Sequence, residues 1–425
     1  MKTFALFNTD FYQVSIMLAY ILRGIESELA GFEAFVRRIN PNVTTKSAYR
    51  FGGEEGLKAF IRNIQGEITD PELLNTFLEL ITPKITHNRD EVVATVKSRW
   101  KHLIENASFQ YNVAGDFTVI KPQVPVFQYW GPRWLGQLIE TPVLNMINGE
   151  TARNTSGKPP HDLMAYVDAV TEQAKLARHA TDKPLLEGGF RRAPSFPQAL
   201  IASNIAITNG WNGTSNIAAA QAGMVPYTSL GGTMAHSYVL SFEKELDAFI
   251  FWDKIFPHTT HLVDTNNVLS AVQMIIDAGI RPSDVRIDCS PIDALCIETR
   301  KLLDKHGLHD VGIYPSGDMS PGLIRMLEQQ GIPLTKTMIG TKYVNPPGFE
   351  DQESGFVYKL VQYIREDRTI FPVKNTVDKK NYPGLKNLYA KGNKIFVDCS
   401  GKLDWFGFEA YSLRKVDDEA EVIFV

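Results

Sequence analysis

Residues suited to binding phosphate and carboxylate groups follow several of the strands that the sequence predicts. Arg191 and Arg192 come after one strand, and Thr233 and His236 come after the glycine pair at residues 231–232. Arginine side chains and the backbone N–H groups of glycine-rich turns bind anions. In a parallel α/β barrel the reacting groups come from the carboxyl ends of the strands, so we expect these residues to share one rim.

The later predicted strands add carboxylates, hydroxyls and one more arginine to this rim. Aspartate oxygens suit ribose hydroxyls, or a Mg²⁺ ion that lies beside phosphate. A lone aspartate or threonine at a strand end is more often the cap of the next helix, but a succession of such strand ends favours a functional rim. A phosphoribosyl or nucleotide substrate is the simplest ligand for the set, which comprises Asp264, Thr265, Arg286, Asp288, Ser316, Gly317, Asp318, Gly340 and Thr341.

His236 is the histidine with the strongest chemical context. The other histidines lie in charged helical runs or turns, where surface or capping roles explain them, whereas His236 follows a glycine turn on the predicted rim. A neutral imidazole there could act as a general base, bind a phosphate, or accept a phosphoryl group as a nucleophile. The alternative is a histidine that only caps the next helix.

A regular alternation of strands and helices, starting near residue 184, must position these side chains. The helical runs between the strands end at glycine, as in VLSAVQMIIDAG and PGLIRMLEQQG. The alternation predicts an α/β fold with a parallel barrel or a doubly wound sheet. The short β-rich runs that contain the predicted strands and the residues after them cover residues 184–192, 225–230, 260–265, 284–289, 310–316 and 336–341.

The rest of the chain reads as a mixed α and β domain. Residues 11–22 have helical spacing, with Thr9 or Asp10 as the N-cap, and residues 116–130 suit short strands at a sheet edge. Residues 154–162, NTSGKPPHD, form the clearest loop. After residue 357 the alternation is lost, and residues 382–425 are expected to be loop-rich with short strands that return to the first domain.

Composition excludes several classes of protein. The 425 residues include 44 Lys+Arg and 48 Asp+Glu, and the basic pairs Arg37–Arg38 and Lys379–Lys380 are isolated, so we expect no nucleic-acid partner. Three cysteines without CxxC spacing favour a reducing compartment. No stretch has the length and apolarity of a signal peptide or a membrane span. We therefore expect a cytoplasmic protein without membrane association.

Many segments, in order, resemble the nicotinate phosphoribosyltransferase family over essentially the whole chain. The order and spacing of so many matches are far more specific than a single short motif. The matching segments are TDFYQVSIMLAY (9–20), FEAFVRR (32–38), FGGEEGLKAF (51–60), LIETPVLNMIN (138–148), LLEGGFRRA (185–193), NGTSNIAAAQAG (212–223), GTMAHSYVLSF (232–242), LVDT (262–265), VRID (285–288), SGDM (316–319) and IGTKYV (339–344).

The resemblance implies an incomplete (β/α) barrel, the type II phosphoribosyltransferase fold, with an α/β sandwich domain built from both termini. The sandwich would comprise residues 1–135 and 357–425, and the barrel residues 136–356. The implied reaction joins nicotinate to 5-phosphoribosyl 1-diphosphate, giving nicotinate mononucleotide and diphosphate in NAD biosynthesis. The resemblance also implies Mg²⁺, coupling to ATP hydrolysis through a phosphohistidine, and a homodimer in which the tyrosine of TDFYQ reaches the partner's barrel.

The resemblance further implies roles for individual residues. Tyr12 would stack on the nicotinate ring, and Thr233 and Arg286 would hold its carboxylate or shape the adjoining pocket. His236 matches the phosphohistidine. Gly340 and Thr341 would bind the 5′-phosphate, and Asp288 would also contact Mg²⁺. The remaining residues of the implied cavity are Arg191, Ser215, Ser316, Gly317 and Asp318.

The chain departs from the family pattern in two places. Where the family commonly reads R-x-D-S-G-D-L, this chain has Pro291 at the position of the second carboxylate, and Asp293 lies two residues later. Either Asp293 replaces that carboxylate through a reshaped loop, or one ribose or metal contact is missing. The loop at residues 154–162 is an apparent insertion beside the rim, and it is either a lid or plain surface.

Two alternative functions remain open at this point. The first is the same reaction with nicotinamide, although a neutral amide offers no counter-charge to Arg286. The second is a degenerate relative that binds a nucleotide or nicotinate without turnover, and the altered segment at residues 288–293 is its only support. Assays of product formation with both pyridines separate the three possibilities.

Overall fold

A five-stranded antiparallel sheet combines strands from both halves of the chain. Its order is β13-β12-β1-β5-β3, and β1 pairs with β12 and β5 along most of its length. The computed structural model describes residues 2–373, 382–391, 393–399 and 417–424, so the Lys379–Lys380 pair lies outside the described residues. The strands are β1 (Leu29–Val36), β3 (Gln110–Val113), β5 (Phe127–Pro132), β12 (Phe356–Arg365) and β13 (Arg368–Ile370).

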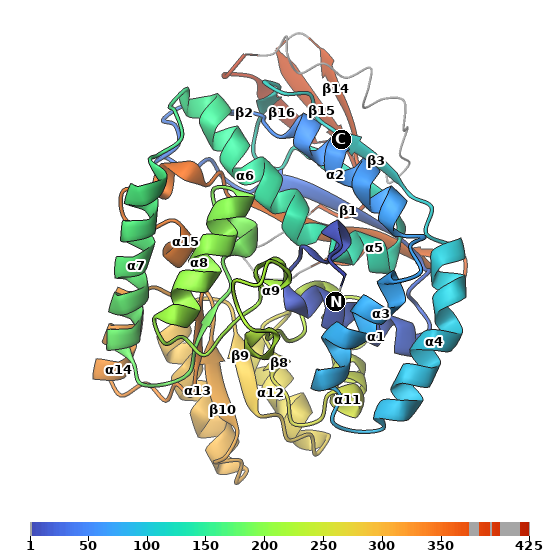
Figure 1. Ribbon diagram of the computed structural model, residues 1–425, viewed down its shortest axis with the longest axis vertical. Helices are drawn as coiled ribbons and strands as arrows, with labels where there is room; N and C mark the ends of the chain where they lie inside the picture. The colour runs from blue at the N-terminus through green and yellow to red at the C-terminus, as the bar shows by residue number, and fades with distance from the viewer. Residues whose placement is uncertain (1, 374–381, 392, 400–416, 425) are drawn as a thin grey trace.

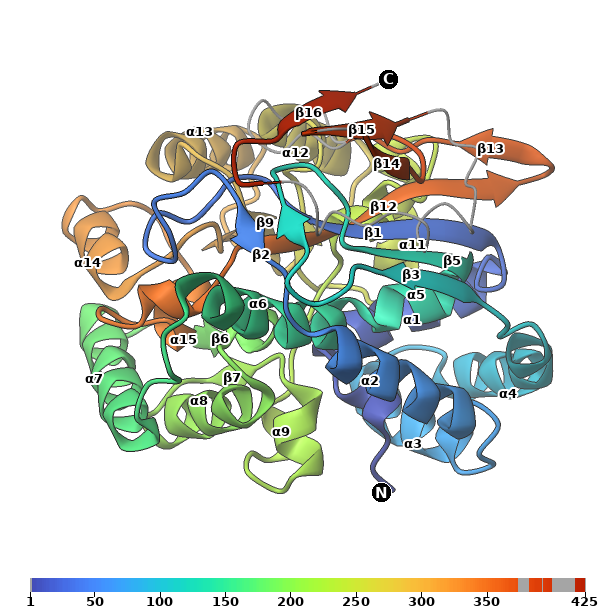
Figure 2. The same cartoon turned by 90° about the horizontal axis from the view of Figure 1, so that it is seen from above.

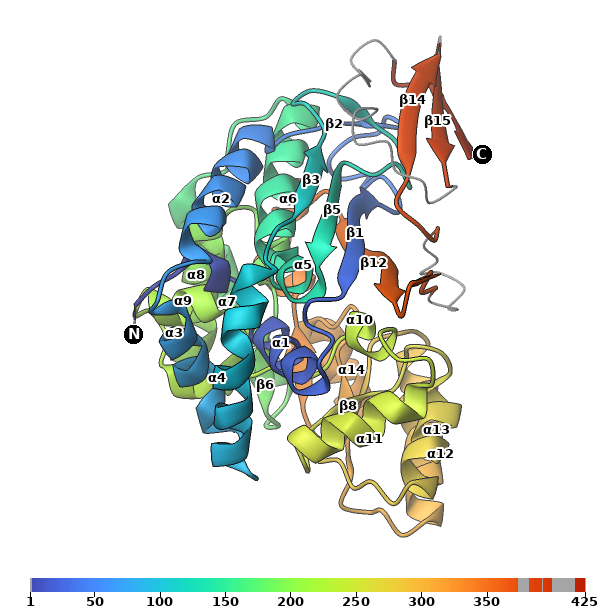
Figure 3. The ribbon, with the colours of Figure 1, turned by 90° about the vertical axis from the view of Figure 1, so that its right-hand side faces the viewer.

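Both faces of this sheet are covered, which is why seven of the eight residues of β1 are buried. In Figure 3 the sheet lies between α2 and α6 on one side and the small sheet β14-β15-β16 on the other. Gly31 allows close approach, because a Cβ atom at this position would lie 2.8 Å from the Leu385 side chain. The covering elements are α2 (Glu54–Glu67), α6 (Glu140–Ser156), β14 (Asn387–Lys391), β15 (Lys394–Asp398) and β16 (Glu421–Phe424).

Shorter elements complete this half of the molecule (Figure 1). The predicted helix at residues 11–22 is present as α1, and its N-cap residue is Asp10, but the Asp10 side chain caps nothing. β5 lies between β1 and β3, so the prediction of edge strands at residues 116–130 was wrong for this strand. The elements are α1 (Phe11–Arg23), β2 (Tyr49–Arg50), α3 (Leu73–Ile81), α4 (Arg89–Glu105), β4 (Val119–Ile120) and α5 (Arg133–Leu138).

The second half of the chain forms an incomplete barrel from two parallel three-stranded sheets, as predicted. Their orders are β8-β9-β10 and β11-β6-β7, with helices arranged around them (Figures 1 and 2). The strands are β6 (Leu185–Glu187), β7 (Gly213–Thr214), β8 (His261–Leu262), β9 (Asp284–Ile287), β10 (Gly312–Pro315) and β11 (Thr337–Ile339). The helices are α7 (Leu163–Ala180), α8 (Phe196–Thr208), α9 (Ile217–Gln221), α10 (His236–Val239), α11 (Glu245–Ile255), α12 (Val268–Asp277), α13 (Ile292–Lys305), α14 (Pro321–Gln329) and α15 (Thr341–Val344).

Individual contacts, in place of continuous strands, join the two sheets. Between β10 and β11, the Thr335 N–H donates to the Ile313 carbonyl at 2.9 Å. Between β7 and β8, the chain makes one parallel bridge at Leu230 instead of the strand predicted for residues 225–230. Pro226 has no N–H to give to a strand ladder, and residues 227–229 turn as a short 3₁₀ helix. Beside the rim, the two sheets of the barrel are therefore joined by individual contacts without continuous strand pairing.

Among the residues that the structure describes, no helix combines the length and apolarity needed to cross a bilayer.

Candidate active site at the barrel rim

His236 and two aspartates from neighbouring strands form the centre of the rim. His236 begins α10, Asp264 follows β8 and Asp288 follows β9. The imidazole Nε2 lies 3.8 Å from Asp264 Oδ1 and 3.9 Å from Asp288 Oδ2. On the other side of the ring, Nδ1 lies 3.1 Å from the Thr265 hydroxyl. The parallel strands thus bring side chains from two other segments, at residues 264–265 and 288, onto one imidazole.

The electrostatics of this cluster favour a bound cation. Asp264 is completely buried and Asp288 is partly exposed, and one ligand atom from each of the three residues fits within 4.8 Å of the others. Two carboxylates held this close repel each other unless a positive charge lies between or beside them. Hard oxygen ligands of this kind fit Mg²⁺. The residues present therefore suit the metal that the family resemblance implies.

The turn after β10 supports Asp288 from the next strand. The Ser316 hydroxyl donates to Asp288 Oδ1 at 3.2 Å. Gly317 packs so closely that a Cβ atom would lie 2.8 Å from the Asp288 carbonyl carbon, so a side chain cannot be accommodated there without a shift. Asp318 is exposed, with a φ angle of 48°. Ser316 and Gly317 thus lie beside the cluster, whereas Asp318 points to the surface of the turn.

Gly340 and Thr341 lie on the opposite side of the rim, beside the turn after β6. The Gly188 N–H donates to the Ile339 carbonyl at 3.0 Å, and a Cβ atom on Gly340 would lie 3.0 Å from the Gly188 carbonyl oxygen. Two glycine turns therefore run side by side here. Backbone N–H groups in such turns can face an anion without a side chain in the way.

Tyr12 and Arg191 form a second cluster with two carboxylates. Arg191 Nη1 lies 3.6 Å from Asp10 Oδ2, and its guanidinium carbon lies 5.9 Å from the Tyr12 ring centre. The Tyr12 hydroxyl donates to Glu140 Oε2 at 3.2 Å. The Tyr12 phenol raises the pKa of Arg191 most, against the effect of burial, and Asp10 and Glu140 act in the same direction. Burial raises the pKa of the Tyr12 phenol itself.

Tyr12 packs against the barrel of its own chain. A Cβ atom on Gly232 would lie 2.4 Å from the Tyr12 backbone nitrogen. The Ser215 hydroxyl donates to Asp10 Oδ1 at 2.5 Å, and the Thr141 hydroxyl donates to Asp10 Oδ2 at 2.7 Å. These contacts all lie within one chain, and the implied reach of the tyrosine into a partner's barrel stays a prediction. Gly232 joins the two clusters, because it contacts Tyr12 and precedes Thr233 and His236 by one and four residues.

Thr233 and Arg286 differ in whether their side-chain donors already have a hydrogen-bond acceptor. The Thr233 hydroxyl donates to the Thr260 carbonyl and so joins the Leu230 segment to β8. Arg286 lies on β9 and is partly exposed, and its Nε is buried without a hydrogen-bond partner among the described residues. Arg286 shares its strand face with Asp288, because side chains alternate along a strand. Arg286 therefore has unused donor capacity, whereas the Thr233 hydroxyl already has an acceptor.

Asp293 is the carboxylate that lies two residues beyond the position of the family's second carboxylate. Asp293 is the second residue of α13, and it is exposed. In the described chain, the candidate metal-binding cluster consists of His236, Asp264 and Asp288, without Asp293. Of this segment, Asp288 is thus the carboxylate that the described chain places in the cluster around His236.

The apparent insertion is shorter than predicted and is held to the barrel. α6 continues to Ser156, so the loop comprises residues 157–162. His161 Nε2 lies 2.8 Å from Asp351 Oδ1, and Lys158 Nζ lies 2.7 Å from Asp351 Oδ2. Burial acts to raise the pKa of Asp351, but the hydrogen bonds from Lys158 and His161 outweigh it and lower that pKa.

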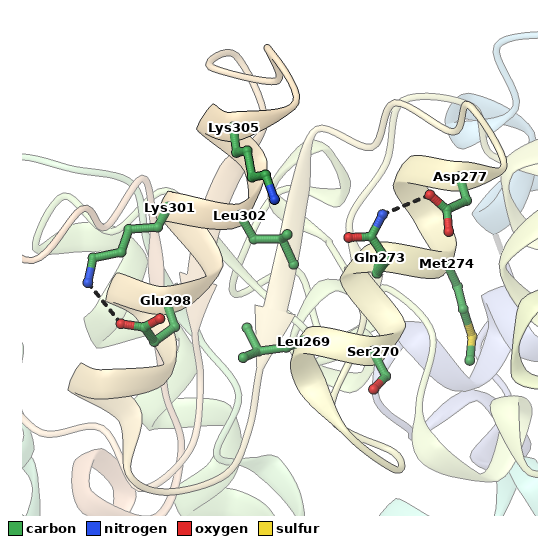
Figure 4. Close-up of a pocket in the computed structure, with 9 residues that line it drawn as sticks. All are labelled: Leu269, Ser270, Gln273, Met274, Asp277, Glu298, Lys301, Leu302 and Lys305. Carbon is green, nitrogen blue, oxygen red and sulfur yellow. Dashed lines mark hydrogen bonds and ion pairs between the residues drawn. The ribbon is translucent and has the colours of Figure 1, made fainter.

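A separate groove lies on the outside of the barrel, between α12 and α13 (Figure 4). One polar pair lies along each helix, with Lys301 Nζ 2.9 Å from Glu298 and the Gln273 amide 2.7 Å from Asp277. None of its lining residues belongs to the rim. They are Leu269, Ser270, Gln273, Met274, Asp277, Glu298, Lys301, Leu302 and Lys305.

Sequence reasoning missed two residues of the second cluster. Asp10 was considered only as one of two candidates, with Thr9, for the N-cap of α1, and Glu140 was not assigned any role, although it lies in the LIETPVLNMIN segment. Asp10 contacts Thr141 and Ser215, which are 131 and 205 residues away in the sequence. Only the packing of the start of α1 against α6 and the turn after β7 brings these residues together, so a local pattern could not have revealed them.

Comparison with known proteins finds similar enzymes along most of the chain. The nicotinate phosphoribosyltransferase of Mycobacterium tuberculosis is 29% identical over 394 residues, which cover 90% of this chain and 75% of the relative. That of Bacillus subtilis is 26% identical over 392 residues, covering 90% of this chain and 72% of the relative. No protein-family model matches the chain. The chain is a homologue of the nicotinate phosphoribosyltransferases.

A solved structure supports the fold of this homologue independently. The nicotinate phosphoribosyltransferase of Porphyromonas gingivalis superposes with a TM-score of 0.66 at 17% identity, covering 90% of this chain and 96% of that chain. At this identity the likeness establishes the fold alone. The homologue thus has the type II phosphoribosyltransferase fold, built on an incomplete α/β barrel. The named relatives, which are enzymes, show that the homologue is an enzyme as well.

Proposed function

We propose that this chain joins nicotinate to 5-phosphoribosyl 1-diphosphate, giving nicotinate mononucleotide and diphosphate in NAD biosynthesis. The observation that carries the proposal is the placement of His236 between the Asp264 and Asp288 carboxylates at the rim of a barrel. The named relatives support the choice of pyridine and of ribosyl donor.

The reaction breaks the bond between the anomeric carbon and a diphosphate oxygen, and the pyridine nitrogen forms the new C–N bond. No proton has to move. Positive charge develops on the ribose ring, so the protein must orient the two reactants and hold the departing diphosphate. Arg286, with unused donor capacity, would bind the nicotinate carboxylate, and Tyr12 would stack on the ring. Thr233 would shape the adjoining wall, since its hydroxyl is bound to Thr260.

The glycine turns would bind the phosphoribosyl part. Gly340 and Thr341 would contact the 5′-phosphate beside the turn at Gly188. Ser316 and Gly317 would contact the ribose from the turn after β10. Asp264 and Asp288 would hold Mg²⁺, which when bound neutralises charge on the diphosphate group. Arg191 and Ser215 would support the pocket through Asp10.

We also propose that ATP hydrolysis is coupled to turnover through His236. The γ-phosphoryl group would move from ATP to a ring nitrogen with release of ADP, and water would later break the P–N bond to give phosphate. The carboxylates near Nε2 favour the tautomer that carries its proton there. Nδ1, beside the Thr265 hydroxyl, is then the nitrogen with the available lone pair.

The family resemblance makes a homodimer the expected assembly. Tyr12 already contacts Gly232 and lies near Arg191 in its own chain, so catalysis as proposed does not require the tyrosine of a partner. Sedimentation of the active enzyme tests the assembly separately from the reaction.

A product assay tests the proposed reaction. The purified chain is incubated with 5-phosphoribosyl 1-diphosphate and Mg²⁺, with either nicotinate or nicotinamide and with or without ATP, and the products are identified by mass spectrometry. We expect nicotinate mononucleotide, formed faster with ATP. Formation of the nicotinamide product in its place would overturn the substrate assignment, and no product from either pyridine would overturn the reaction. His236→Ala should remove the effect of ATP while slow synthesis persists, and an unchanged effect of ATP would exclude the phosphohistidine.

A further inference from the structure

Arg37 is a partly buried arginine with unused hydrogen-bonding capacity. It follows directly after Val36, the last residue of β1, and its Nε and Nη2 atoms are buried without a hydrogen-bond partner among the described residues. Buried polar groups in folded proteins are normally hydrogen-bonded, so each exception needs an explanation. The next residue, Arg38, is exposed. The sequence pair therefore splits into one arginine directed inward and one on the surface.

The position of Arg37 is set by the pairing of β1 with β12. Val36 pairs with Phe356, and the Phe356 carbonyl accepts a hydrogen bond of 2.6 Å from Arg192 Nη1. Arg192 therefore lies at the same end of the sheet as Arg37. Arg192 is one of the two arginines that follow β6 on the barrel rim. The end of β1 thus reaches the rim from the side of the sandwich domain.

The two arginines differ in how their charge is compensated. Arg192 Nη1 donates to Glu353 Oε1 at 2.9 Å, so a carboxylate balances it. Arg37 makes no ion pair in the described chain. Burial lowers the pKa of Arg37 to about 10, the charge of Arg192 adds to this effect, and the Asp288 carboxylate opposes it. The charge of Arg37 therefore interacts with that of Arg192 and with the Asp288 carboxylate of the His236 cluster.

A cation held beside another cation at the mouth of a site is typical of anion binding. A guanidinium group presents several N–H donors in a plane, which match the oxygens of a phosphoryl group. Arg37 has such donors unused, and Arg192 adds positive charge next to them. A carboxylate ligand would fit less well here, because Arg286 already has the barrel-side position suited to it.

We propose that Arg37 binds phosphoryl oxygens of the phosphorylated substrate where the end of β1 meets the barrel rim. The ligand class is a phosphate or diphosphate oxyanion, carried either by the leaving diphosphate or by the 5-phosphate of the ribose. This inference rests on the proposed function, and it adds to the site a residue from the sandwich domain. The substrate pocket is then complete only where the two domains are in contact.

Substitutions at the two neighbouring arginines test the inference. Arg37→Gln should raise the KM for 5-phosphoribosyl 1-diphosphate about 10- to 100-fold, because a charged hydrogen bond to the substrate is lost. The KM for nicotinate should change less than twofold. Arg37→Lys should recover part of the loss, since it restores the charge without the planar donors. Arg38→Gln, the matched control, should leave both constants at the values of the original chain.

Titration calorimetry with inorganic phosphate, diphosphate and ribose 5-phosphate identifies which oxyanion Arg37 contacts. The oxyanion whose affinity falls in Arg37→Gln but not in Arg38→Gln is the one that Arg37 binds. If the original chain makes product and Arg37→Gln keeps its KM and all three affinities, the inference is wrong. If the original chain makes no product but binds an oxyanion through Arg37, the proposed function fails and the anion site stands. Should Arg37→Gln lack a cooperative thermal unfolding transition, Arg37→Lys carries the same comparison.

Discussion

Asp284 and Asp288 lie four residues apart on the same strand region, at opposite ends of the barrel, and their surroundings differ completely. Asp284, at the start of β9, accepts hydrogen bonds from Lys336, from the Ser283 hydroxyl at 2.6 Å and from the Thr335 hydroxyl at 3.0 Å. Asp288, after the end of β9, accepts a hydrogen bond from the Ser316 hydroxyl and lies beside Asp264 near the same nitrogen of the His236 ring.

This contrast separates a structural polar cluster from a functional one. At the floor of the barrel each charge meets an opposite charge and several hydroxyl donors, so the cluster is complete without a ligand. At the rim, the Asp264 and Asp288 carboxylates lie beside one imidazole, that of His236. The charges of Arg37 and Arg192 also act on each other there. Like charges placed together raise the energy of the folded chain unless a ligand compensates them. The floor therefore stabilises the barrel, whereas the rim is the candidate site.

The largest expected effect is the loss of activity in Asp288→Asn. Removing a carboxylate that faces His236 should lower kcat/KM about 10²- to 10³-fold, because charge that develops during the reaction loses its support. The thermal unfolding temperature should stay the same or rise, since one of two repelling carboxylates is gone. Steady-state kinetics and calorimetry measure both. A variant that unfolds at much lower temperature would contradict the division between floor and rim.

The matched change at the floor is Asp284→Asn, for which we expect a loss of stability instead. Lys336 would remain partly buried without its carboxylate, and this should cost about 3 kcal/mol of unfolding free energy. Denaturant titration measures the loss. The activity per folded molecule should stay within about twofold of the original chain. A large fall in kcat for the folded fraction would show that the floor takes part in the reaction.

An intermediate effect is expected for the contact between Tyr12 and Glu140. Tyr12→Phe and Glu140→Gln should each raise the KM for nicotinate about tenfold, because the ring loses the hydrogen bond that orients it, while kcat changes little. The double variant should be no worse than either single one, since both remove the same contact. Additive losses in KM would mean that the two residues act separately.

The smallest effect concerns His261, at the floor end of β8. Both ring nitrogens face backbone carbonyls, of Thr259 and Phe249, yet burial lowers the pKa of His261 below its ordinary 6.5. The unfolded chain therefore takes up a proton below about pH 6.5 that the folded chain resists, so stability is full above that pH and falls as the pH drops towards the folded pKa.

One such group changes the unfolding free energy by at most about 1.4 kcal/mol per pH unit. His261→Gln should make the unfolding free energy less dependent on pH between 7.5 and 5.5, whatever its absolute value. Denaturant titrations at several pH values test this. An unchanged slope would show that other groups cause the pH dependence.

The sequence predicted the barrel and its rim well where the signal was local. Strand and helix periodicity placed β8 to β11, and the residues after them include Asp264, Thr265, Asp288 and Ser316, which lie around His236. It failed for residues 225–230, because β-forming side chains do not reveal that Pro226 leads into a turn. It also failed for β5, whose interior place depends on pairing with both β1 and β3.

By itself the sequence determined which chemical groups stand at the strand ends, since the order of strands, turns and glycines is written in local spacing. Only the tertiary structure decided how those groups are paired. Packing of α1 and of the end of β1 against the barrel brought Asp10 to Arg191 and Arg37 to the neighbourhood of Asp288. The physical reason is that electrostatic compensation depends on distance in space, which residues far apart in the chain do not reveal until it folds.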